Sequence, residues 1–117
     1  MEAEPIYLDY NATTPLIEPV KRAMLETLDE FGNLSSSHWY EVRAKRILEN
    51  AREKIASLIN CDPEEIIFTS SGSESNSLAI KGVALKFKKG HIITFAIEHP
   101  SVLNVCEFLK KEGFRIT

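Results

Sequence analysis

The second half of the chain alternates between short apolar runs and longer helical patterns, and this alternation constrains the fold more than any other feature. Three strand-like runs are separated by two helical segments: 66–70, 72–87, 91–95, 100–111 and 114–117. Strands alternating with helices of this length are typical of a parallel sheet with crossover helices. The sequence therefore predicts an α/β fold. The helical pattern at 72–87 is apolar nearly all round, which predicts that this helix is well buried.

The first sixty residues indicate loops and helices. Residues 6–8 are a short apolar strand candidate, and a helix with an apolar face is expected from Pro19 to about Phe31. A stripe of apolar residues from Ala44 to Ile59 predicts an amphipathic helix. We therefore expect two parts: 1–60, an N-terminal loop and helical segment, and 61–117, the first βαβαβ part of a larger sheet domain.

The predicted sheet is small for its class. Parallel sheets are stable when both faces are covered, and three strands with two helices barely achieve that. We therefore expect the chain to be a fragment, a split subunit, or the first part of a larger protein.

Composition excludes several classes of function. The net charge is −3, which gives no support for direct nucleic-acid binding. The apolar runs are far too short to span a membrane, and the first ten residues have no secretory-signal pattern. Cys61 and Cys106 lie far apart without metal-ligand spacing, which favours reduced thiols, a cytoplasmic location and no metal site.

Residues 68–82, FTSSGSESNSLAIKG, leave a predicted strand through a serine-rich turn that also contains Gly72 and Glu74. Ser71 and Glu74 fit a capping box, which would simply start the helix. Alternatively, Gly72 lets the backbone approach an anion, and the hydroxyls of Ser71 and Ser73 add donors at the positive end of the helix dipole. The two interpretations are compatible. This stretch alone favours the cap.

A second polar turn, AIEHP at 96–100, follows the next predicted strand. Because His99 precedes a proline, it is expected to be extended, at or near the N-cap of the helix after it. Turns that follow successive strands of such a sheet can face one crevice. A histidine there could stack on a flat cofactor or move protons near neutral pH, or it could be an ordinary loop residue.

Two further loops, 7–15 and 32–38, read by themselves as turns. Together, however, four stretches resemble one family in order and spacing: YLDYNATTPL, GN-x-SSSH, FTSSGSESNSLAIKG and IITFAIEHPSVLN. They are similar to the N-terminal third of a cysteine desulfurase, a pyridoxal 5'-phosphate (PLP) enzyme of the class V aminotransferase group. The resemblance runs from Ile6 to Thr117.

The resemblance implies a PLP-dependent transferase large domain with a mostly parallel sheet, a smaller C-terminal domain and a homodimer. Gly72 and Ser73 match the pair that binds the PLP phosphate. His99 matches the histidine that stacks on the pyridine ring and acts in acid–base catalysis. Five further positions match loops near the substrate, the active-site entrance or the dimer contact: Asn11, Ala12, Thr13, Asn33 and His38.

The implied reaction takes sulfur from L-cysteine, leaving alanine and an enzyme persulfide. A sulfur-acceptor protein then carries the sulfur to iron–sulfur cluster assembly or tRNA thiolation. The family's Schiff-base lysine, pyridine-pairing aspartate, carboxylate-binding arginine and nucleophilic cysteine have no counterpart here, and neither Cys61 nor Cys106 matches that nucleophile. We therefore expect the chain to be inactive without a C-terminal segment or a complementary subunit.

Other functions remain compatible with these residues. Selenocysteine lyases and kynureninase-like enzymes share the N-terminal motifs. A non-catalytic remnant or partner subunit would carry them without activity. An unrelated phosphate-binding module would bind anions but would show no effect of PLP.

Overall fold

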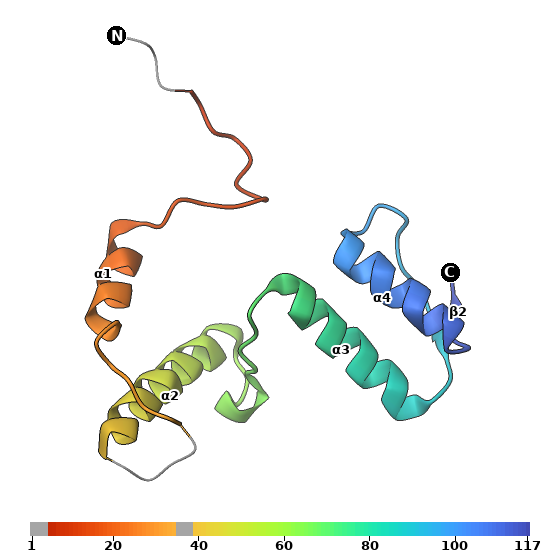
Figure 1. The fold of residues 1–117 in the computed structure, drawn as a ribbon. Coiled ribbons are helices and arrows are strands. Elements are labelled where there is room, and N and C mark those ends of the chain that lie inside the picture. Colours follow the sequence, from red (N-terminus) through yellow and green to blue (C-terminus); the bar gives the residue numbers. More distant parts are fainter. Residues whose placement is uncertain (1–4, 35–38) are drawn as a thin grey trace. The chain divides into compact units, whose positions relative to one another are not determined.

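A computed structural model describes residues 5–34 and 39–117. The chain divides into two compact units, Met1–Ile66 and Ile67–Thr117, each considered by itself. The first contains α1 (Glu18–Thr27), α2 (Trp39–Ile59) and the 3-10 turn η1 (Pro63–Glu65). The second contains α3 (Gly72–Phe87), β1 (His91–Ile92), α4 (Pro100–Lys111) and β2 (Arg115–Ile116) (Figure 1). The functional division predicted at residue 60 stays a prediction.

Helix α1 begins one residue before the expected Pro19 but ends at Thr27, four residues early. The Thr27 hydroxyl lies 3.2 Å from the Ala23 carbonyl and 2.9 Å from the Met24 carbonyl. A threonine hydroxyl that bonds back to the preceding turn competes with the backbone and favours a helix end. This local bonding accounts for the shorter helix.

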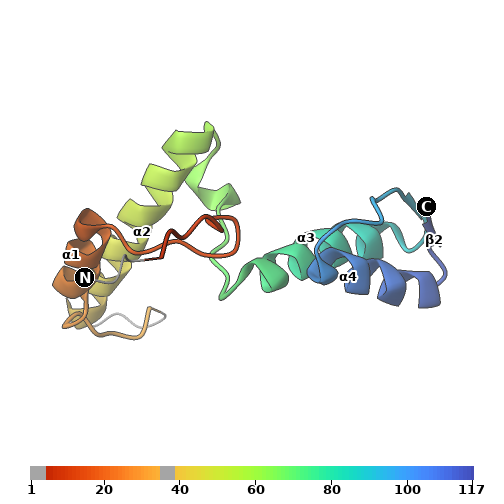
Figure 2. The ribbon, with the colours of Figure 1, turned by 90° about the horizontal axis from the view of Figure 1, so that it is seen from above.

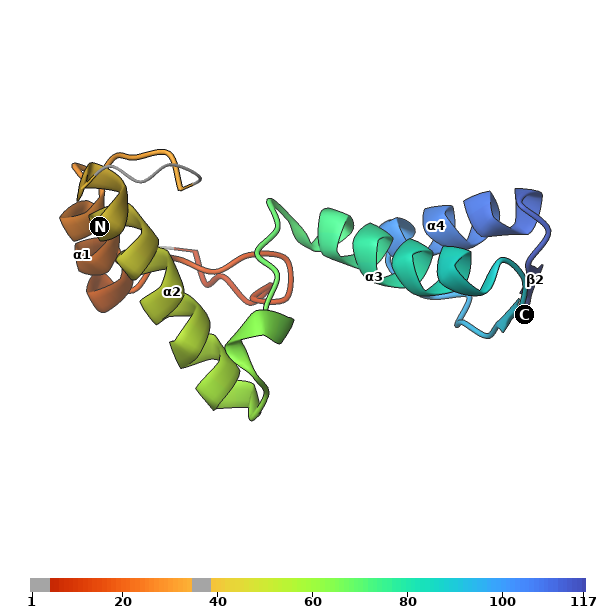
Figure 3. The ribbon, with the colours of Figure 1, turned by 90° about the horizontal axis from the view of Figure 1, so that it is seen from below.

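Helix α2 and the turn η1 pack together, and Figures 2 and 3 show η1 beside the C-terminal end of α2. The Arg52 guanidinium donates to the Ile66 carbonyl, which ties the chain after η1 back to α2. Within η1, the Asp62 amide donates to Glu65 Oε2 at 2.9 Å, and the Glu65 amide donates to the Asp62 carbonyl at 3.0 Å. These bonds hold the chain after α2 in a short 3-10 turn.

Two predicted strands do not form in the described chain. Residues 6–8 and 66–70 carry no strand, and Ile6 and Leu8 are each 84% exposed. A strand exists only through hydrogen bonds to a neighbouring strand. Within residues 5–34 and 39–117, β1 and β2 are the only strands, and they pair with each other. The apolar pattern at 66–70 therefore lacks a partner here.

The second unit confirms the α/β class with a small parallel sheet. His91 pairs with Arg115 and Ile92 with Ile116. The Thr117 amide donates to the Ile92 carbonyl at 3.0 Å, and the Thr94 amide donates to the Thr117 carbonyl at 2.8 Å. Pairing therefore continues slightly past the assigned strands, although both are shorter than the runs that predicted them.

The core of the second unit lies where α3, α4 and the sheet meet, and α3 and α4 run side by side (Figures 2 and 3). It consists of Ala84, Val105, Leu109 and Phe114, with Ile80, Ile92 and Ile116 packed against it. The expectation that α3 is well buried is wrong: Val83 and Phe87 are 62% and 67% exposed. The described elements cover one side of α3 and leave much of its apolar surface uncovered.

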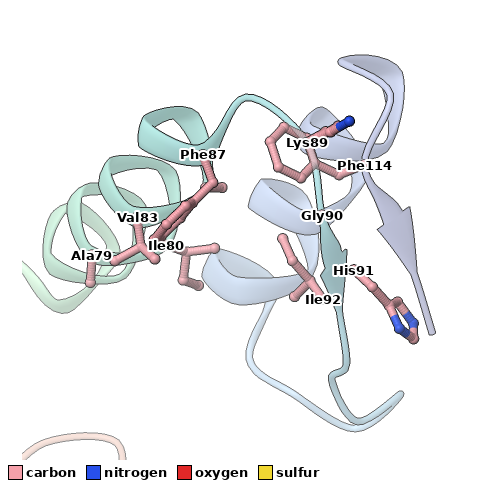
Figure 4. A pocket seen from close by; sticks show the side chains of 10 residues that line it. Ala79, Ile80, Val83, Phe87, Lys89, Gly90, His91, Ile92 and Phe114 are labelled. Atoms are coloured by element: carbon pink, nitrogen blue, oxygen red, sulfur yellow. The ribbon is translucent and has the colours of Figure 1, made fainter.

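An apolar cavity of about 530 Å³ lies between α3 and β1 (Figure 4). Phe87, Val83, Ile80 and Ile92 line it, while the His91 ring points away from them. His91 Nδ1 lies 2.7 Å from an Arg115 guanidinium nitrogen, and its Nε2 lies 2.8 Å from Thr117 Oγ1. The lining is mostly apolar, with Lys89 and His91 as its polar side chains.

Among the described residues, none of the helices combines the length and hydropathy needed to cross a lipid bilayer.

Candidate functional site

The start of α3 is capped as the sequence predicts. Ser71 is the N-cap, with extended backbone, and its Oγ accepts from the Glu74 amide at 3.3 Å. The Ser71 carbonyl accepts from the Ser75 amide at 3.0 Å. A helix start leaves four backbone N–H groups without helical partners. The Ser75 bond is the first i→i−4 bond of the helix and the Ser71 side chain caps the Glu74 amide, which leaves the N–H groups of the first two helical residues, Gly72 and Ser73.

The second half of the predicted capping box is displaced by one residue. Glu74 Oε2 accepts from the Ser70 amide at 2.7 Å and from the Ser70 hydroxyl at 2.6 Å. These two bonds lower the pKa of Glu74, the hydroxyl contributing most, because both stabilise the ionised carboxylate. Ser70 offers two donors to one carboxylate oxygen, and hydrogen bonds to a charged acceptor are the stronger kind.

Gly72 and Ser73 form an exposed donor set. Within the part of the chain that the structure describes, neither backbone N–H has an acceptor. A Cβ built on Gly72 would meet no atom within 4 Å, so the space around this helix start is unobstructed. Two N–H groups and a serine hydroxyl at the positive end of a helix dipole suit an anion.

His99 is the N-cap of α4, as expected from the proline that follows it. Its backbone is extended, with ψ of 144°, and Pro100 occupies the first helical position. The Ser101 amide donates to His99 Nδ1 at 3.1 Å, and the Ser101 hydroxyl oxygen lies 2.8 Å from the same nitrogen. The imidazole therefore closes the start of α4 much as a serine or aspartate would.

The two polar turns meet at one cavity of about 330 Å³, which is smaller and more polar than the cavity between α3 and β1. It is lined by Ser71, Gly72, Ser73, Asn76, His99 and Ser101. The structure thus brings together four of the residues singled out from the sequence: Ser71, Gly72, Ser73 and His99. The packing of α3 against α4 and the Asn76–Ser101 hydrogen bond bring these two helix starts together.

Sequence reasoning missed two residues of this cavity, Asn76 and Ser101. The Asn76 side-chain amide donates to Ser101 Oγ at 2.8 Å, which joins α3 to α4. Both carried a signal in their spacing. Asn76 lies four residues after Gly72, hence on the same helix face, and Ser101 lies two residues after a capping histidine.

The remaining predicted residues belong to the first unit or lie outside the described residues. Asn11, Ala12 and Thr13 form an exposed turn in which the Ala12 amide donates to the Asp9 carbonyl at 3.1 Å. Asn33 is exposed, and His38 lies outside the described residues. The roles of these five residues stay predictions.

The two cysteines are free thiols. Partial burial, followed by the charges of Glu65 and Asp62, raises the pKa of the Cys61 thiol. Since the thiolate is the nucleophilic form, Cys61 is poorly suited to attack sulfur, and Cys106 is buried. Among the described residues, no three His, Cys, Asp or Glu side chains gather where a metal ion could bind.

Comparison with known proteins gives concordant matches. The family model "Aminotransferase class-V" matches residues 6–117. Cysteine desulfurase IscS of Dictyoglomus turgidum is 54% identical over 115 residues, covering 96% of this chain and 29% of the relative. The Pseudomonas aeruginosa (strain LESB58) protein of the same name is 50% identical over 119 residues, covering 97% and 30%.

Solved structures agree with these relatives. "SspA in complex with cysteine" superposes with a TM-score of 0.87 at 46% identity, covering 95% of this chain and 33% of that one. A "NifS-like protein" superposes with a TM-score of 0.89 at 37% identity, covering 96% and 32%. The chain therefore spans about 30% of the length of the curated relatives that it matches.

Proposed function

The chain belongs to the class V aminotransferase family, and from that premise we propose that it provides the phosphate-binding part of a PLP-dependent cysteine desulfurase. The observation that carries the proposal is the shared cavity of the α3 start and His99. The curated relatives named cysteine desulfurase IscS and the neighbour solved with cysteine support the choice of reaction.

The residues present fit the phosphate of PLP. A phosphate monoester carries close to two negative charges and three acceptor oxygens at neutral pH. The Gly72 and Ser73 N–H groups with the Ser73 hydroxyl supply donors, and the helix dipole supplies positive potential. Among the described residues, none with a carboxylate lines the cavity, and Glu74, the nearest acid in sequence, has its Oε2 engaged by Ser70.

His99 would lie against the ring of the bound cofactor. Its Nδ1 is engaged by Ser101, which fixes the imidazole at the edge of the cavity and leaves Nε2 for proton exchange. PLP, when bound, supplies the electron sink for bond cleavage in an amino-acid substrate. This chain's residues would anchor the phosphate, orient the ring and offer a proton at Nε2.

The rest of the proposal follows the resemblance. L-cysteine is the substrate, and alanine and an enzyme persulfide are the products, the persulfide passing to a sulfur-acceptor protein. The lysine and the thiolate would come from a C-terminal segment or complementary subunit, within a homodimer. Asn11, Ala12 and Thr13 would lie near the substrate, and Asn33 and His38 near the entrance. Free thiols at Cys61 and Cys106 fit a reducing, cytoplasmic location.

The test is a ³¹P NMR titration of PLP with the 117-residue chain and two matched variants. Gly72→Asp places a carboxylate among the phosphate donors, whereas Gly82→Asp makes the same change further along α3. A Cβ at either glycine meets nothing within 4 Å. Because an aspartate in the first turn favours a helix, loss of binding in Gly72→Asp would not signify unfolding.

We expect wild type and Gly82→Asp to shift the PLP phosphorus resonance, with excess inorganic phosphate reversing the shift, and Gly72→Asp to leave it unchanged. Equal binding by both variants would contradict the phosphate site. For the reaction, the chain is mixed with the C-terminal part of the D. turgidum relative, and alanine and sulfide are measured from L-cysteine. Turnover of selenocysteine alone would instead indicate a lyase.

A further inference from the structure

Three polar side chains that line the cavity form a continuous chain of hydrogen bonds. The Asn76 side-chain amide on α3 donates to Ser101 Oγ on α4 at 2.8 Å. Ser101 Oγ lies 2.8 Å from His99 Nδ1, and the Ser101 backbone amide reaches the same nitrogen at 3.1 Å. Asn76 and Ser101 are partly buried, whereas His99 is exposed.

The direction of these bonds follows from the donors. A backbone N–H can only donate, so His99 Nδ1 must accept and carries no hydrogen. The Ser101 oxygen already accepts from Asn76, which leaves its own hydrogen free to point to Nδ1. An imidazole without hydrogen on Nδ1 is neutral with its proton on Nε2.

The position of His99 at a helix start favours the same state. A proton on Nδ1 would break the cap that Nδ1 provides to the Ser101 amide. The backbone and the Asn76–Ser101 pair thus favour one tautomer.

We propose that Asn76 and Ser101 are positioning residues that select the tautomer of His99 with hydrogen on Nε2, so that the ring offers a hydrogen-bond donor to the cavity. The use of that donor in the reaction rests on the proposed function. The tautomer does not, because all of its determinants are side chains and backbone of this unit. Asn76 matters because its amide sets the direction of the Ser101 hydroxyl.

An Asn76→Asp substitution tests this direction with almost no change of shape. A carboxylate at this position accepts the Ser101 hydroxyl hydrogen, so that Oγ presents lone pairs to His99 Nδ1. Nδ1 is then favoured as a donor, which favours the other tautomer, with hydrogen on Nδ1. Asn104→Asp is the matched control, since it adds the same charge at an exposed position of α4.

The measurement is long-range ¹H–¹⁵N NMR of the histidine rings in the 117-residue chain without PLP. His99 is assigned by its disappearance in His99→Gln. His91, whose Nδ1 lies next to the Arg115 guanidinium, is an internal reference that the substitutions should leave unchanged. Circular dichroism confirms that each variant retains the wild-type helix content.

In wild type and Asn104→Asp, we expect the His99 Nδ1 resonance in the range of an unprotonated nitrogen and Nε2 in that of a protonated one. Asn76→Asp should move Nδ1 into the protonated range. Ser101→Ala should give averaged intermediate shifts, and Ser101→Thr should restore the wild-type pattern.

The proposal is overturned if Asn76→Asp and Ser101→Ala both keep the wild-type His99 shifts, because the backbone cap alone would then set the tautomer. A chain that fails to bind PLP yet shows the expected shifts would contradict the proposed function and leave this inference standing. Failure of either can therefore be told from failure of the other.

Discussion

Glu74 reaches back across the start of α3 to Ser70, with Oε2 2.7 Å from the Ser70 amide and 2.6 Å from its hydroxyl. The residue that caps the helix, Ser71, lies between them and accepts from the Glu74 amide. These hydrogen bonds join the loop before α3 to the first turn of the helix. A carboxylate thus braces the loop that leads into the proposed phosphate site.

Acidification should weaken the hydrogen bonds between Glu74 and Ser70. Because the Ser70 bonds lower the pKa of Glu74 in the folded state, its contribution to stability is complete above the ordinary carboxyl pKa of 4.5 and is lost as the pH falls through the lower folded pKa. In thermal unfolding followed by circular dichroism, we expect Glu74→Gln to have a lower Tm than wild type at pH 7, with the difference shrinking below about pH 4.

Glu107→Gln, which neutralises an exposed carboxylate of α4, is the control for the general effect of removing one charge. A Tm difference that is the same for both variants at every pH would show that the Ser70 bonds contribute nothing to stability.

The two serines that flank Gly72 should separate stability from binding. Ser71→Ala removes the N-cap acceptor and should reduce the free energy of unfolding by about 1 kcal/mol. Ser73→Ala removes an exposed hydroxyl and should change it by less than about 0.5 kcal/mol, while weakening PLP binding. Urea unfolding measures the stability, and the ³¹P titration measures PLP binding. A stability loss in Ser73→Ala as large as that in Ser71→Ala would refute the assignment of Ser71 to the helix cap and Ser73 to binding.

Gly113 should resist substitution because of its backbone alone. Its φ is +93°, in the region that favours glycine, and an added Cβ would meet no atom within 4 Å. Gly113→Ala should therefore lower the free energy of unfolding by about 1–2 kcal/mol. Gly82→Ala, equally unobstructed but within α3, should raise it by about 0.5–1 kcal/mol. Urea unfolding of the two variants checks the opposite signs.

Leu109 is the most deeply buried side chain of the second unit, at 0% exposure. Leu109→Ala should reduce the free energy of unfolding by about 2–5 kcal/mol, through lost burial and the cavity left behind. Leu85→Ala, at a side chain that is 49% exposed, should cost clearly less. Hydrogen exchange of the α3 and α4 amides would report both effects, and similar exchange in the two variants would argue against a core centred on Leu109.

The features that the sequence predicts well are the locally encoded ones. Ser71 caps α3, and the proline after His99 places that histidine at the N-cap of α4, because caps depend on residues a few positions apart. The meeting of Gly72 and His99 at one cavity was also expected, since successive strand-to-helix turns share a sheet edge. The α/β class of the fold likewise follows from the alternation of strand and helix patterns along residues 66–117.

The features that it does not predict depend on distant partners. Residues 66–70 have a strand pattern, but a pattern cannot supply the neighbouring strand. The apolar faces of α3 likewise predict burial without saying what covers Val83 or Phe87. The bond from Asn76 to Ser101 joins side chains 25 residues apart, and no local signal specifies such a pairing.

The uncovered apolar surface of α3 has a thermodynamic consequence. The heat-capacity change and the denaturant m-value both scale with the surface that unfolding newly exposes to water. In the second unit, side chains such as Val83 and Phe87 are already largely hydrated when folded, and the large cavity beside them is lined by carbon. The second unit should therefore unfold with a small m-value in urea and a small heat-capacity change. Any polypeptide that covers α3 should increase both quantities.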